Sequence, residues 1–158
     1  MSSSIEQLIH KQEIQELQVI YAVAIDSGDY DRLDNIFTDN AVGVYGRPYV
    51  GLEAIKGAMY SGCEYLTSVQ HLNANHWSVV TGDTAEAGCY LHVVQYLENT
   101  PGGDHHEMGG EYSDELVLTE SGWRITKRSI EIKWTKGNPL IRDKRSLEAA
   151  RGVNGQED

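Results

Sequence analysis

The chain has 158 residues, a formal net charge of −11 at pH 7 and 40% hydrophobic residues, which together predict a single water-soluble domain. The negative charge argues against nucleic-acid binding, because that function needs a basic patch. No apolar run approaches the roughly 18–20 residues of a membrane span. The common nucleotide and zinc motifs are missing from the sequence, so we expect no cofactor, no metal and no membrane partner.

The N-terminus and the cysteines indicate a cytoplasmic protein. The segment MSSSIEQLIHKQEIQ lacks the basic-then-apolar order of a signal peptide. Cys63 and Cys89 have no metal-ligand spacing and stand among small or apolar residues. We therefore expect packed thiols rather than a disulfide or a nucleophile.

The first part of the sequence predicts helices. Residues 4–26 carry apolar side chains at helical spacing and predict one long helix. After a Ser-Gly break, Asp29 is placed to cap a short second helix that ends near Asn40. A short strand at 42–46 and a third helix at 51–60 follow.

From there the apolar period changes to two. Four strands are predicted at 69–80, 85–97, 110–119 and 122–134. Tight turns predict antiparallel pairing, with a Gly/Pro-rich loop at 98–110. Apolar positions of the last strand switch from odd to even, which predicts a β-bulge near Thr126–Ser129 that bends the sheet. Residues 1–141 then form the single domain, and the charged tail 142–158 is expected to be frayed or peripheral.

Helices followed by a strongly curved antiparallel sheet predict an α+β domain, in which the helices pack into the concave face and leave a pocket. Asp26 stands in the last turn of the first helix. There it opposes the helix dipole at a cost of a few tenths to about 1 kcal/mol. A protonated histidine would compensate this acid inside a pocket, whereas the alternative is a solvated carboxylate in a turn.

The sequence offers six histidines as partners for Asp26. His71 shares its strand face with Asn73 and Trp77, and this mixed face suits an organic ligand. His76 has the opposite parity and is expected on the other face. We expect His10 on the surface and His105 and His106 in a solvated loop, and the pattern leaves the face of His92 undecided.

Several segments resemble a known family. They are AIDSGDYDRLDNIF, the tyrosine of VYG, VQHLNAN and GEYSDELVLTESGWRI. Together they resemble the SnoaL-like, scytalone-dehydratase-like branch of the nuclear-transport-factor-2-like superfamily, over about residues 5–138. The resemblance implies a cone-shaped α+β barrel. It also implies an Asp–His dyad that abstracts a proton without a cofactor, as in dehydratases, dehydrochlorinases and isomerase or cyclase relatives.

The resemblance also implies roles for single residues. Asp26 and His71 match the catalytic dyad of the family. Tyr45 matches a tyrosine that in the dehydratases orients the substrate or a water on its carbonyl oxygen. Tyr21 matches a pocket tyrosine of a steroid dehydratase relative.

The sequence departs from scytalone dehydratase at two pocket positions. Gln95 stands where that enzyme has a second histidine, and Ile25 where it has a tyrosine, which argues against scytalone as the substrate. We expect Tyr45, with Gln95 or Asn73, to donate hydrogen bonds to an enolate or a leaving hydroxide. The apolar wall of the pocket is expected to come from Tyr112, Trp77 and Trp134.

The sequence therefore favours a small lyase, a dehydratase or a related eliminating or isomerising enzyme, that acts on a hydrophobic cyclic, polyketide-like or steroid-like compound. A non-catalytic ligand-binding or oligomerisation module is the alternative, because one fold serves many functions. A polyketide cyclase and a protein like the β-subunit of a ring dioxygenase are further alternatives. A homo-oligomer, dimer or trimer, is predicted from apolar residues expected on the outer sheet face: Leu72, Ala74, Val80, Val94, Leu116 and Leu118.

Overall fold

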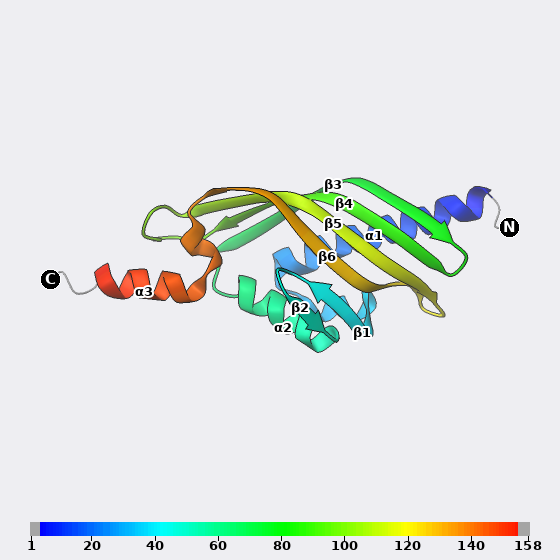
Figure 1. Cartoon of the computed structure of the whole chain (residues 1–158), viewed down its shortest axis with the longest axis horizontal. Coiled ribbons are helices and arrows are strands. Elements are labelled where there is room, and N and C mark those ends of the chain that lie inside the picture. Colours follow the sequence, from blue (N-terminus) through cyan, green and yellow to red (C-terminus); the bar gives the residue numbers. More distant parts are fainter. Residues whose placement is uncertain (1–3, 155–158) are drawn as a thin grey trace.

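The computed structural model describes residues 4–154 and confirms the α+β class, with a curved, open sheet and helices on its inner side (Figure 1). The sheet has six strands in the order β2-β1-β6-β5-β4-β3. Neighbouring strands are antiparallel except for the parallel pair β1 and β6. The helices are α1 (Ser4–Ser27), η1 (Tyr30–Asn35), α2 (Leu52–Cys63), η2 (Pro139–Arg142) and α3 (Lys144–Asn154). The strands are β1 (Phe37–Val44), β2 (Pro48–Val50), β3 (Ser68–Thr81), β4 (Thr84–Tyr96), β5 (His105–Thr119) and β6 (Gly122–Gly137).

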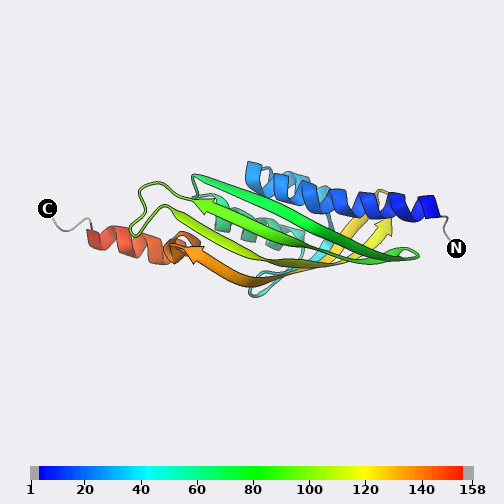
Figure 2. The same ribbon diagram turned by 90° about the horizontal axis from the view of Figure 1, so that it is seen from above.

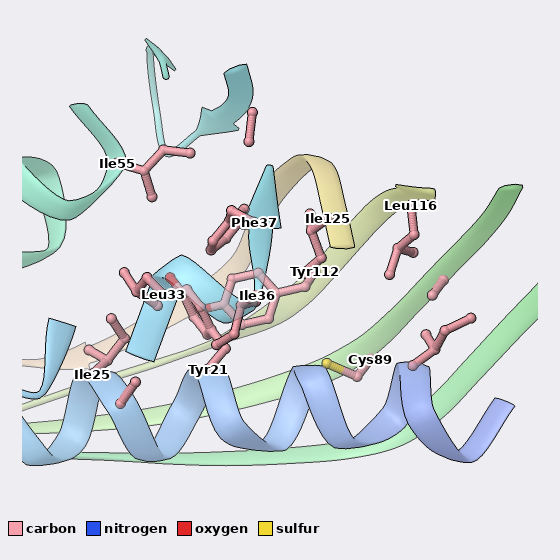
Figure 3. Close-up of a cluster of buried hydrophobic side chains, with 14 of the residues drawn as sticks. Tyr21, Ile25, Leu33, Ile36, Phe37, Ile55, Cys89, Tyr112, Leu116 and Ile125 are labelled. Atoms are coloured by element: carbon pink, nitrogen blue, oxygen red, sulfur yellow. The ribbon is translucent and has the colours of Figure 1, made fainter. Parts of the chain in front are cut away.

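The long helix α1 packs along the sheet beside β3 (Figure 2). Its buried side chains include Ile14, Gln18, Tyr21 and Ile25, each at most 2% exposed. These residues are three or four positions apart, so they share one face of the helix. Figure 3 shows Tyr21 and Ile25 pointing from α1 into the core around Leu33. This packing brings the C-terminal end of α1 against the beginning of β3.

The prediction of a second helix that ends near Asn40 is wrong in the second half of that helix. Only the short 3-10 helix η1 forms, and the chain is already extended at Phe37. Asp29 is the N-cap residue of η1, as predicted, but its carboxylate makes no capping hydrogen bond and instead accepts one from Arg32 Nε at 2.9 Å. Phe37 pairs instead with Ile125 of β6. A pairing between segments so distant in sequence leaves no periodic signal in the segment around Phe37. The predicted strand 42–46 is the end of the longer strand β1.

The predicted bulge in the last strand is confirmed. Ile125 pairs with Leu116 and Lys127 pairs with Glu115, so Thr126 is an extra residue on β6. An extra residue bends its strand and reverses which positions face inward. The bulge therefore explains why the apolar positions of this strand switch from odd to even numbers.

Two further bulges were not predicted, and each turns a tryptophan outward. Lys133 is an extra residue on β6, so Trp134 lies on the outer face although it follows the inward-facing Ile132 by two positions. The ladder of β3 also shifts its register, between Ala74 and Trp77. The two tryptophans are 47% and 49% exposed. The expectation that they line the pocket is wrong because each bulge reverses the alternation of faces.

The outer face also differs from the predicted one. Leu72 is 57% exposed as expected, whereas Leu116 is 3% exposed because the even positions of β5 face inward with Tyr112. Val80 and Leu118 are packed against the core. We use the name outer apolar face for the exposed side chains Leu72, Trp77, Val79, Tyr90 and Trp134.

The connection before β5 and the C-terminal segment also differ from expectation. Strand β5 already begins at His105, so the loop is shorter than the predicted 98–110. The predicted tail is peripheral (Figure 1) but helical over 144–154. Leu147 is 2% exposed because it packs against Ile141. Residues 155–158 of the predicted tail lie outside the described residues.

Candidate functional site

The carboxylate of Asp26 accepts two hydrogen bonds from His71. Asp26 Oδ1 lies 2.5 Å from the ring Nδ1, and Oδ2 accepts the backbone N–H of His71 at 2.8 Å. The side chain of His71 is 8% exposed and that of Asp26 is 24% exposed. The predicted contact between these side chains is thus confirmed, and the alternative of an unpartnered carboxylate in a solvated turn is wrong.

The local sequence explains this placement. Gly28 has a φ of 69°, a left-handed conformation that ends α1 at little steric cost. Asp26 therefore stays in the last helical turn, where the carboxylate opposes the helix dipole. The two N–H groups of His71 compensate this unfavourable position.

The geometry assigns the protons of the pair. A carboxylate only accepts hydrogen bonds, so Nδ1 of His71 carries a proton that points at Asp26. In the neutral ring Nε2 then has a free lone pair. Within residues 4–154 the structure gives Nε2 no hydrogen-bond partner. Such a nitrogen is suited to act as a general base.

A cleft of about 350 Å³ opens beside Asp26, a size within the range of small-molecule sites. It lies between the ends of α1 and α2 and the start of β3. The lining combines apolar or aromatic side chains, among them Ile25, Tyr30 and Cys63, with polar ones such as Glu64 and Thr67. Burial raises the pKa of the Cys63 thiol to about 11, so this cysteine is a neutral part of the wall, as predicted.

Tyr45 and Tyr21 lie together in the core. Their hydroxyl oxygens are 3.4 Å apart, and the Tyr21 hydroxyl is also 3.1 Å from Met59 Sδ. Burial raises the pKa of both tyrosines, because it disfavours the charged phenolate. Their hydroxyl groups therefore stay protonated and remain able to donate a hydrogen bond.

Sequence reasoning missed a buried arginine beside these tyrosines. The Cζ atom of Arg128 lies 4.3 Å from the ring centroid of Tyr21 and 4.6 Å from that of Tyr112. Its Nε and Nη2 donate to Asp114 at 2.7 Å each, and both charged side chains are fully buried. Nη1 has no partner. One sequence feature could have indicated this buried arginine: Asp114 is an acid at an inward position between Tyr112 and Leu116.

Asn73 and Gln95 lie on the inner side of the sheet, and each has one unpartnered oxygen. Asn73 Nδ2 donates to the backbone oxygen of Gln18 at 3.1 Å, whereas Asn73 Oδ1 is buried without a partner. Gln95 Oε1 is likewise buried without a partner. Gln95 pairs with Val69, which lines the cleft beside Asp26. Buried acceptors of this kind favour a ligand that donates hydrogen bonds.

The other histidines lie away from the dyad, and three were predicted wrongly. His10 is not on the open surface but receives a hydrogen bond from Trp123 Nε1 at 3.1 Å. His106 is 2% exposed in β5 rather than solvated in a loop. His76 faces α1 because of the β3 bulge. His92 and His105 share the carboxylate of Glu107.

An open, curved sheet with a long helix along its inner side and an Asp–His pair at the end of that helix defines a nuclear-transport-factor-2-like α+β protein. The sequence matches the SnoaL-like domain family over residues 6–129, and the chain belongs to this family. A protein of Mycobacterium tuberculosis strain H37Rv is 31% identical over 135 residues, which cover 79% of this chain and 86% of that protein. That relative is described as uncharacterized.

Solved structures share the fold. A protein of Kribbella flavida has a TM-score of 0.79 at 21% identity and covers 86% of this chain and 99% of its own. A candidate scytalone dehydratase of Novosphingobium aromaticivorans has a TM-score of 0.74 at 17% identity, covering 84% and 89%. A hexachlorocyclohexane dehydrochlorinase of Novosphingobium barchaimii has a TM-score of 0.77 at 17% identity, covering 87% and 95%.

Two kinds of feature are absent from residues 4–154. No group of three or more histidine, cysteine or acidic side chains there is arranged to hold a metal ion. In the same part of the chain no helix combines the length and the apolar character needed to cross a membrane.

Proposed function

We propose that this protein is a cofactor-independent lyase, a dehydratase or a related eliminating or isomerising enzyme, in which His71 abstracts a proton. The observation that carries the proposal is the pair of hydrogen bonds from His71 to Asp26, which leaves Nε2 of the ring free. The proposed substrate is a hydrophobic cyclic compound of polyketide or steroid type. The apolar and aromatic part of the mixed lining of the cleft beside Asp26, with Ile25, Tyr30 and Tyr60, supports a hydrophobic ligand.

In the proposed reaction, Nε2 of His71 takes a proton from the carbon next to a carbonyl group. The electron pair of that C–H bond forms an enolate and then a C=C bond, while the β-hydroxyl group leaves. The proton on His71 joins the leaving hydroxide, so the products are the unsaturated ketone and water. Asp26 holds the ring and stabilises the imidazolium, and Tyr45 donates a hydrogen bond to the developing oxyanion.

Exchange of substrate hydrogen for deuterium tests proton abstraction without knowledge of the leaving group. We expect cyclic β-hydroxyketones to gain deuterium next to the carbonyl when they are incubated with the full chain in D₂O, as followed by mass spectrometry. The exchange rate should not fall as the pH is raised to 10.0, the ordinary tyrosine value, because burial raises the pKa of Tyr45 well above it.

Chelation and exhaustive dialysis should leave this exchange rate unchanged. An exchange rate that EDTA abolishes contradicts the proposal. The alternative of a non-catalytic binding module gives a different result, because it predicts saturable binding of the same compounds without any exchange. The buried, unpartnered oxygens of Asn73 and Gln95 are compatible with such binding.

We also propose a homo-oligomer that forms through the outer apolar face. Trp77 and Leu72 are 49% and 57% exposed there, and exposed patches of this kind mark interaction sites. Trp77→Lys should therefore dissociate the assembly in light scattering. Val50→Lys, at a site 71% exposed away from this face, should not. A wild-type mass near 17.6 kDa, the mass of one chain, at micromolar concentration would contradict the homo-oligomer.

We further propose that the protein acts in the cytoplasm. Cys63 and Cys89 are both free thiols. Burial raises the pKa of each to about 11, so both are neutral and weakly reactive. Unpaired cysteines are typical of a reducing compartment.

A further inference from the structure

A second cleft, of about 360 Å³, lies between α1 and the second half of β3. We call it the α1–β3 cleft, and it shares no lining residue with the cleft beside Asp26. The bulge of β3, where Asn75 has a φ of 53°, turns His76 toward α1. The lining residues are Lys11, Ile14, Gln15, Gln18, His76, Trp77 and Ser78.

A chain of hydrogen bonds from the core determines which ring nitrogen of His76 is free. Asp114 is bound by Arg128, and its Oδ2 also accepts a hydrogen bond from Gln18 Nε2 at 3.2 Å. The amide oxygen of Gln18 must therefore point the other way, and it lies 2.6 Å from Nδ1 of His76. Because an amide oxygen only accepts, Nδ1 carries the proton. Nε2 has no hydrogen-bond partner within the described part of the chain.

The charge of this cleft differs from that of the whole protein. The chain has 24 acidic residues, but none of the seven residues that line the cleft is acidic. Lys11 has no ion-pair partner among residues 4–154. The charge of Asp114, which lies behind Gln18, is balanced by Arg128. When His76 is protonated, the cleft presents an ammonium group and an Nε2–H.

We propose that the α1–β3 cleft binds a small organic carboxylate. The carboxylate contacts Lys11 and the Nε2–H of protonated His76. Charge-assisted hydrogen bonds of this type are stronger than neutral ones. Binding is independent of the proposed lyase activity, because it uses none of the dyad residues.

Benzoate is the probe ligand. Benzamide is the neutral control ligand, and benzylamine is the cationic one. We expect benzoate to shift the Nε2 resonance of His76 in the full chain labelled with ¹⁵N-histidine, and to saturate at millimolar concentration, whereas the two analogues do not. In calorimetry, Lys11→Gln and His76→Gln should each weaken benzoate binding by about tenfold or more. Lys136→Gln, which removes the same charge at the far end of β6, should leave the affinity unchanged.

Three results overturn this proposal. One is a benzoate response of His76 no larger than the benzamide response. Another is equal weakening by Lys11→Gln and Lys136→Gln, which would indicate a nonspecific effect of net charge. The third is loss of benzoate binding in Asp26→Asn, which would place the ligand in the other cleft. Failure of the lyase proposal leaves all of these measurements interpretable, because none of them requires turnover.

Discussion

Replacing His71 by alanine should abolish turnover, with a loss of about 10²–10⁴-fold in kcat that is typical of a missing general base. The reason is that Nε2 of His71 is the nitrogen proposed to take the substrate proton, and Asp26 cannot replace it from behind the ring. The deuterium exchange described above measures the effect. Fold and ligand binding should persist, since the substitution only removes a ring beside an existing cleft.

His92→Ala is the matched control, because His92 also pairs with a carboxylate, that of Glu107, but lies on the outer face. It should retain the wild-type rate. Asp26→Asn should lower kcat strongly with little change in KM, because it keeps the shape of the side chain and removes the charge that stabilises the imidazolium. A His71→Ala variant that exchanges deuterium at the wild-type rate would show that the dyad assignment is wrong.

Replacing Arg128 by methionine should lower the free energy of unfolding by about 3–5 kcal/mol, because it leaves the Asp114 carboxylate buried without its counter-charge. Both side chains of the pair are fully buried, and the guanidinium also lies between two tyrosine rings. Urea denaturation measures the change. The double variant Arg128→Met with Asp114→Leu should recover much of the loss, because it removes both charges together.

Lys127→Met is the control for this experiment, because Lys127 is adjacent in sequence but forms an exposed ion pair with Glu115. Exposed pairs contribute about 0–1 kcal/mol, so this variant should be nearly as stable as the wild type. If Arg128→Met and Lys127→Met are equally mild, the buried pair is not a main determinant of stability in this protein.

Local patterns determined much of the fold and the central pair of the candidate site. The helical spacing of residues 4–26 and the period of two after residue 68 belong to single segments, so they are legible in the sequence. The bulge at Thr126 was also legible, because it interrupts an otherwise regular apolar alternation. Asp26 and His71 followed from the resemblance and from an acid placed against the helix dipole.

Some bulges reverse the alternation of inward and outward side chains without changing the apolar pattern of the strand. At those places only the tertiary structure decided which side chains face inward. Trp77 and Trp134 stand at positions that regular strands would turn inward, but bulges set by the pairing of β3 with β4 and of β6 with β5 turn them outward. The strand that begins at Phe37 and the buried Arg128–Asp114 pair depend in the same way on distant partners. A charged residue is buried only when the fold places an opposite charge beside it. Neither the segment of Arg128 nor that of Asp114 shows by itself that the two charges will be neighbours.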